Sequence, residues 1–105
     1  MNEKYTIHFS SLDWIEPALG VRFKSILKDD KKLRLVEFTE EFIEENWCTK
    51  GHIGFIVEGE MEINFNGVIN KFNAGDALFI PEGENHRHKH HSTGQRVKLF
   101  LVEET

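Results

Sequence analysis

This sequence has very little cysteine. It also shows no apolar run long enough to span a membrane and no pattern of a signal peptide. Cys48 is the single cysteine among 105 residues, so no disulfide can form within the chain, which favours a reducing compartment. No apolar run approaches the length of a transmembrane helix, and the polar start of residues 1–4 lacks the layout of a signal peptide. We therefore expect a cytoplasmic protein with no membrane partner.

Positive charge is also in short supply. Lys and Arg number 13 against 18 Asp and Glu, which leaves a net charge of -5 at pH 7. Proteins that bind the phosphate backbone of a nucleic acid carry the opposite balance, so we expect no nucleic acid partner and favour a small molecule. Core material is present, with 39% hydrophobic residues and nine Phe, and this amount suits one globular domain over residues 1–105.

Helical periodicity is nearly absent, and short runs of alternating apolar and polar residues take its place. The Asn66-Gly67 dipeptide favours the positive φ angles of a type I′ turn, which predicts a tight hairpin. The alternation of Tyr5, Ile7 and Phe9 predicts a further strand, which would pair with the other strands of this chain or with a second copy of the chain. The other expected strands span residues 21–27, 33–42, 52–58, 60–65, 68–72, 77–80 and 97–102. So many short strands without helices predict an all-β sandwich or barrel.

Residues 75–86 carry the most specific pattern in the chain: a glycine, five residues, a proline, one residue, a glycine, two residues and a histidine. Gly75 permits a turn into the strand, and Pro81 and Gly83 restrict the loop that carries His86. This pattern resembles the second sequence motif of the cupin family. The resemblance implies a single-domain, cupin-type jelly-roll β-barrel with His86 aimed into its interior.

The first cupin motif is present in a weaker form. In the family this motif runs H-x-H, three or four residues, Glu, six residues and Gly, and Gly59 resembles its last position. Counting back from Gly59, His52 stands where the family has its Glu, and Cys48 and Asn46 stand where it has its two histidines. The string from Trp47 to His52 also resembles one found in some small cupins. Together the two motifs run from about residue 46 to residue 86.

The resemblance implies that the motif residues converge inside the barrel on a divalent transition metal. Cys48, His52 and His86 are then the candidate ligands, with Asn46 or Glu45 as the source of a fourth oxygen. Thiolate and imidazole suit Zn, Fe, Ni or Cu, and three protein ligands leave a position open for water or substrate. The alternative interpretation is a buried Cys48, a His52 that only forms hydrogen bonds, and no metal.

A histidine-rich run follows the second motif. His88 and His90 alternate with charged residues, so a strand that continues from His86 would place three imidazoles on the inner face. Residues 87–91 equally fit a solvated edge strand whose charges prevent aggregation. We favour the edge interpretation for His90 and His91 and leave both interpretations open for His88.

Other candidates for a small-molecule site lie beside the proposed ligands. Asn46, Trp47 and His88 are the candidates for lining a substrate pocket. Trp47 would stack on a bound ring there, although a large side chain next to a pocket more often forms part of the core wall. Glu45 and His88 are the candidates for proton transfer.

Two functions remain open at this stage. The first is a metal-dependent enzyme acting on a sugar or an organic acid. Isomerases, lyases and dioxygenases all occur in the family that the sequence resembles, and the fold alone does not choose among them. The second is a non-catalytic cupin that binds a small molecule without metal. Cupins commonly pair through their sheets, so the resemblance also implies a homodimer.

Overall fold

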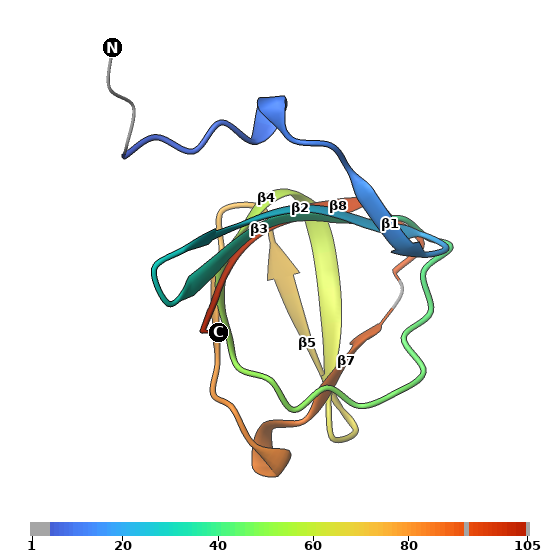
Figure 1. Ribbon diagram of the computed structural model, residues 1–105. Coiled ribbons are helices and arrows are strands. Elements are labelled where there is room, and N and C mark those ends of the chain that lie inside the picture. Colours follow the sequence, from blue (N-terminus) through green and yellow to red (C-terminus); the bar gives the residue numbers. More distant parts are fainter. Residues whose placement is uncertain (1–4, 92, 105) are drawn as a thin grey trace.

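The computed structural model describes residues 5–91 and 93–104, and the chain there is built from strands (Figure 1). The strands are β1 (Ile15–Ala18), β2 (Val21–Lys28), β3 (Lys31–Phe38), β4 (His52–Phe65), β5 (Val68–Asn73), β6 (Ala77–Ile80), β7 (His88–His91) and β8 (Val97–Glu104). Two 3-10 helices, η1 (Phe9–Ser11) and η2 (Glu84–His86), complete the described elements. No helix in these two ranges is long and apolar enough to span a bilayer. The predicted all-β class is confirmed.

Several predicted strands differ from the structure, and those expected over residues 52–58 and 60–65 form one strand, β4 (His52–Phe65). The strand expected over residues 33–42 ends at Phe38, where β3 stops. The strand expected from Tyr5 to Phe9 does not form, because the chain enters the 3-10 turn of η1 at Phe9. Ser11 stabilises that turn by donating its hydroxyl proton to the carbonyl oxygen of His8 at 2.8 Å, a local hydrogen bond that competes with strand pairing.

The longest strand, β4, belongs to two sheets. Its first half pairs with β8 and β6 in a sheet that continues through β3 and β2 to β1, and its second half pairs with β5 and β7. The change occurs at Gly59, which has a φ of 80° and follows a register shift between Ile56 and Glu58. A Cβ at Gly59 would clash with the carbonyl oxygen of Arg96, so glycine is required there. The sheet therefore curls into an open barrel (Figure 1).

The predicted hairpin between β4 and β5 is confirmed. Phe65 pairs with Val68 across a two-residue turn, and both turn residues have positive φ angles, 54° at Asn66 and 101° at Gly67. The side-chain oxygen of Asn64 accepts a hydrogen bond from the backbone N–H of Gly67 at 2.7 Å. These features match a type I′ turn.

The core lies between the inner faces of the two sheets. Each contributing strand sends every second side chain inward, so the burial pattern alternates, as it does in β8 from Val97 to Leu101. The buried apolar side chains are Val36, Ile56, Met61, Ile63, Leu78, Ile80, Val97, Leu99 and Leu101. They come from strands of both sheets, and most of them line a cavity between the inner faces, which contains the candidate site.

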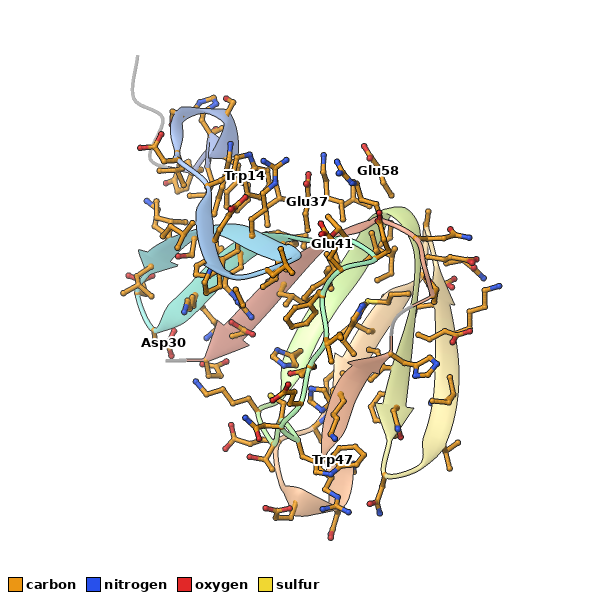
Figure 2. All side chains as sticks on the ribbon, turned by 90° about the vertical axis from the view of Figure 1, so that its right-hand side faces the viewer. Trp14, Asp30, Glu37, Glu41, Trp47 and Glu58 are labelled. Atoms are coloured by element: carbon orange, nitrogen blue, oxygen red, sulfur yellow. The ribbon has the colours of Figure 1, made fainter. Side chains whose placement is uncertain are left out.

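The outer face of the larger sheet has a charged part and an apolar part. Glu37 is buried there between Arg22, at 2.8 Å, and Lys98, at 3.4 Å. Trp14 covers Arg22, and Figure 2 shows Trp14 on the same side of the molecule as Glu37. Across the same sheet, Ile53, Phe55 and Phe79 are exposed on β4 and β6.

Candidate metal centre

A cavity of about 330 Å³ lies between the inner faces of the two sheets. The segment that follows β3, residues 39–47, contributes Phe42 and Glu44 to its wall. Glu44 accepts a hydrogen bond from the backbone N–H of His90 on β7 at 2.7 Å. This bond attaches the segment to the opposite sheet, so the connection between β3 and β4 closes part of the barrel.

Cys48, His52 and His88 meet at one end of this cavity. Their ligand-capable side-chain atoms all lie within 4.8 Å of one another. Cys48 and His88 form a backbone bridge with N–H to O=C distances of 2.8 and 2.9 Å, which brings their side chains to the same side. His52 begins β4, and its imidazole meets that of His88 edge-on with the ring centroids 5.2 Å apart.

The nitrogens of both imidazoles that face away from the cluster have acceptors. Nδ1 of His52 lies 2.6 Å from a carboxylate oxygen of Glu103, as a charge contact rather than an in-line hydrogen bond. Nδ1 of His88 donates to the carbonyl oxygen of His86 at 3.1 Å. Both contacts favour a proton on Nδ1 and leave Nε2 as the free donor atom. Nε2 of His52 lies 3.9 Å from Sγ of Cys48, so one sulfur and two nitrogens form a set that suits a transition metal.

The electrostatics of the cluster couple the thiol to the imidazoles. The imidazoles of His52 and His88 lower the pKa of Cys48 to about 6. Burial by itself would lower the pKa of His52, but Cys48 and Glu103 outweigh burial and raise it to about 9. Without a metal, Cys48 is therefore a thiolate and His52 an imidazolium at neutral pH. A metal ion would bind the same thiolate and would displace the proton of His52.

Glu103 supports the site, although it was not among the residues predicted from the motifs. Arg34 holds its carboxylate with two hydrogen bonds of 2.8 and 2.7 Å. Burial alone would raise the pKa of Glu103, but His52 and Arg34 together lower it to about 2. A signal for this residue exists in the sequence, because Glu103 continues the inward alternation of Val97 to Leu101 along β8. A carboxylate at the end of an apolar inner row requires a partner.

His86 does not occupy its expected place. The prediction that it points into the barrel is wrong, because it is exposed at the end of η2. The alternation that governs a strand begins only at His88, where β7 starts, so the buried imidazole is the one two residues later. The backbone of His86 still contributes, since its carbonyl oxygen accepts the Nδ1 proton of His88.

The neighbours of Cys48 in the sequence also lie elsewhere than predicted. Asn46 and Glu45 are exposed and are not among the residues that line the cavity. Trp47 lies outside it as well, with the guanidinium of Arg87 and the ammonium of Lys89 over its ring at 4.6 and 4.5 Å from the centroid. Figure 2 shows Trp47 at the end of the molecule far from Trp14. Successive side chains of residues 39–47 point to opposite sides, so the carboxylate that faces the cavity is that of Glu44 and not that of Glu45.

The second inward imidazole of β7 belongs to His90. The strand lies at a sheet edge, as the interpretation that we favoured expects, because among the described strands β7 pairs with β4 alone. The expected solvation holds for His91, which is exposed, but is wrong for His90, which lines the cavity. Its ring stacks on Phe38 with centroids 4.5 Å apart, and Phe42 stacks on Phe38 at 4.9 Å. Burial, with a smaller effect of His91, lowers the pKa of His90 to about 4, so its ring is neutral at pH 7.

Comparison with known proteins identifies the fold. A family model described as a cupin domain matches residues 44–103, which is more than half of the chain. None of the curated proteins matches this sequence. The matched region includes all three residues of the cluster and Glu103.

Solved structures of similar shape agree with this match. An RmlC-like cupin from Shewanella frigidimarina NCIMB 400 has 16% identity and a TM-score of 0.76, over 96% of this chain and 90% of that one. The polyketide cyclase RemF from Streptomyces resistomycificus has 20% identity and a TM-score of 0.71, over 94% of this chain and 78% of that one. The EutQ protein of Clostridium difficile has 16% identity and a TM-score of 0.66 over 80% of this chain, which spans only 61% of EutQ. These likenesses concern the fold.

Proposed function

Because this chain belongs to the cupin family, we propose that it binds one divalent transition metal through Cys48, His52 and His88 and holds a small molecule in the adjoining cavity. The observation that carries the proposal is the convergence of one sulfur and two nitrogens within 4.8 Å at the cavity wall. Zn, Fe, Ni and Cu all accept such a donor set. Both imidazoles have acceptors on their far side, which is the arrangement that orients histidine ligands.

Three protein ligands leave room in the coordination of the metal. A bound transition metal would supply Lewis acidity and an open position beside the cavity. The chain itself contributes orientation: Glu103 faces the Nδ1 atom of His52, and Arg34 holds Glu103 in place. Glu45 lies outside this arrangement and is not proposed as a proton carrier. Isomerases, lyases and dioxygenases share the fold.

The test is the metal content of untagged protein, measured by elemental analysis with two histidine variants as a matched pair. We expect close to one equivalent of a transition metal in the wild type. His88→Ala should lower it below about a tenth of an equivalent, because the loss of one of three ligands removes most of the affinity. His86→Ala should retain the metal, since His86 is exposed. An equal loss in both variants, or a wild type that stays metal-free when Zn is supplied, would contradict the proposal.

A second candidate is a binding protein that uses no metal. One observation favours it: the thiolate of Cys48 and the imidazolium of His52 neutralise each other, so the cluster needs no metal to balance its charge. In that case Cys48→Ser should weaken ligand binding in protein treated with a chelator. Ligand binding that instead requires added metal would exclude this candidate.

We also propose a homodimer that forms through the outer face of the larger sheet. Ile53 pairs directly with Phe79 there, and these side chains are 53% and 73% exposed. An apolar patch of this kind marks a partner surface, and Phe9 of the N-terminal segment already packs against Phe100 on the same sheet. Sedimentation analysis should find a dimer that Phe79→Glu dissociates. Ile69→Glu on β5 is the control, and dissociation by both variants would contradict this interface.

A cytoplasmic location is part of the same proposal. The thiol of Cys48 must stay reduced to serve as a ligand, and a reducing compartment keeps it so.

A further inference from the structure

The wall of the cavity has a polar part, at the metal cluster, and a larger apolar part. Beyond the metal cluster, most of the inner surface consists of carbon, and its central side chains are only 2–6% exposed. These central residues are Val36, Met61, Ile63, Leu78, Leu99 and Leu101. A molecule that extends from the cluster into the barrel therefore meets aliphatic groups over most of its surface.

Most polar groups of the wall are already engaged with one another. Arg34 gives two hydrogen bonds to Glu103, and Glu44 accepts the backbone N–H of His90. Cys48 and the two other cluster residues face a single point. Within the described part of the chain, the lining thus offers one concentrated polar spot and one further buried nitrogen without a hydrogen-bond partner, Nδ1 of His90, but no row of free donors and acceptors. Several hydroxyl groups on one ligand would enter this cavity without partners, which is unfavourable.

The far end of the cavity is aromatic. Phe38, Phe42 and His90 form a stacked group there. The cavity volume of about 330 Å³ lies at the lower end of the range of ligand sites. A single ring with a short substituent suits this size.

We propose that the ligand is a small organic acid with an apolar ring or branched body, whose carboxylate points at Cys48, His52 and His88, and that it is not a sugar. This inference deepens the proposed function, because it names the ligand class of the same site. The carboxylate would serve as a ligand for a transition metal in the open position. The apolar body gains from leaving water for the aliphatic wall.

The experiment compares two probes that share a six-membered ring and a carboxylate, cyclohexanecarboxylate and glucuronate. Calorimetry on untagged protein, with and without chelator treatment, should find cyclohexanecarboxylate bound at least tenfold more tightly, since only glucuronate brings hydroxyl groups into the cavity. Ala18→Phe should weaken that binding at least tenfold, because Ala18 lines the cavity and is exposed enough to accept a larger side chain. Ala74→Phe, in an exposed turn away from the cavity lining, is the control.

The outcomes separate this inference from the proposed function. Equal or tighter binding of glucuronate overturns the inference, as does an absence of binding of both probes or a loss of binding that Ala18→Phe and Ala74→Phe share. Metal content measured on the same samples reports on the proposed function alone. If metal-free protein binds cyclohexanecarboxylate, the inferred ligand class stands and the metal centre is refuted. If metal-loaded protein prefers glucuronate, the metal centre stands and the inferred ligand class is refuted.

Discussion

The two ends of the cavity give opposite properties to the same side chain. His52 lies beside a thiolate and a carboxylate, and its pKa is raised to about 9. His90 lies in a stack of phenyl rings, and its pKa is lowered to about 4. Burial opposes the charged form of both imidazoles, so the difference comes from the neighbours. A buried histidine in this barrel is therefore charged only where the chain supplies an anion.

The largest expected effect comes from removing that anion. Glu103→Gln in metal-free protein should lower the free energy of unfolding by on the order of 2 kcal/mol, because Arg34 and His52 both lose a buried partner. Urea unfolding at pH 7 measures this loss. The pKa of Glu103 is about 2 in the folded protein against an ordinary value of 4.5. Its contribution is therefore present above pH 4.5 and disappears as the pH falls toward 2, and the variant should lack that dependence.

The neighbouring carboxylate provides the control for this comparison. Glu104 forms an ion pair with Lys31 at 3.2 Å, but its side chain is 71% exposed. Glu104→Gln should change the free energy of unfolding by less than about 0.5 kcal/mol. Equal losses of unfolding free energy in the two variants would mean that Glu103 contributes no more to stability than an exposed carboxylate does.

A smaller effect is expected at the aromatic end of the cavity. The pKa of His90 is lower in the folded protein than its ordinary value of 6.5, so its contribution to stability is present above pH 6.5 and is lost as the pH falls toward 4. His90→Phe keeps the ring stack and removes the titration. Between pH 6 and pH 4.5 the variant should lose roughly 1.5 kcal/mol less stability than the wild type. Thermal unfolding across that range measures the difference, and parallel curves would contradict the assignment.

The smallest effect should come from the ring on the outer side of β7. Trp47→Leu removes the contacts with Arg87 and Lys89, which are worth about 0.5–1 kcal/mol at an exposed site. Metal content and ligand affinity should stay the same, because Trp47 does not line the cavity. Trp47→Phe retains an aromatic face and serves as the control. A Trp47→Leu variant that loses metal would contradict the assignment of Trp47 to the outside of the cavity.

Much of the fold could be predicted from local patterns. The turn at Asn66-Gly67 and the strand over Ala77–Ile80 follow from backbone preferences and alternation that act over a few residues. The strand expected at residues 5–9 failed for a local reason too, since the hydrogen bonds around Ser11 close a 3-10 turn. The continuity of β4 through Gly59 was missed because a bulge and a strand end look alike in sequence.

The candidate site was only half predictable. Cys48 and His52 come together as expected, but the motif histidine, His86, is exposed and His88 completes the cluster. The spacing of a motif does not reveal at which residue a loop ends and the alternation of a strand begins. The pairing of Glu103 with His52 joins two strands 51 residues apart in the chain (103 − 52), and no local pattern encodes such a contact.

The sequence by itself determined the all-β class, the cupin-like motif and the presence of a thiol and several imidazoles near that motif, because short-range backbone preferences and residue chemistry carry that information. The tertiary structure alone decided which imidazole is buried, which carboxylate faces it and which histidine stays neutral. The physical reason is that a pKa and a ligand set depend on distances of a few ångströms between strands, which exist only after the sheet has curled.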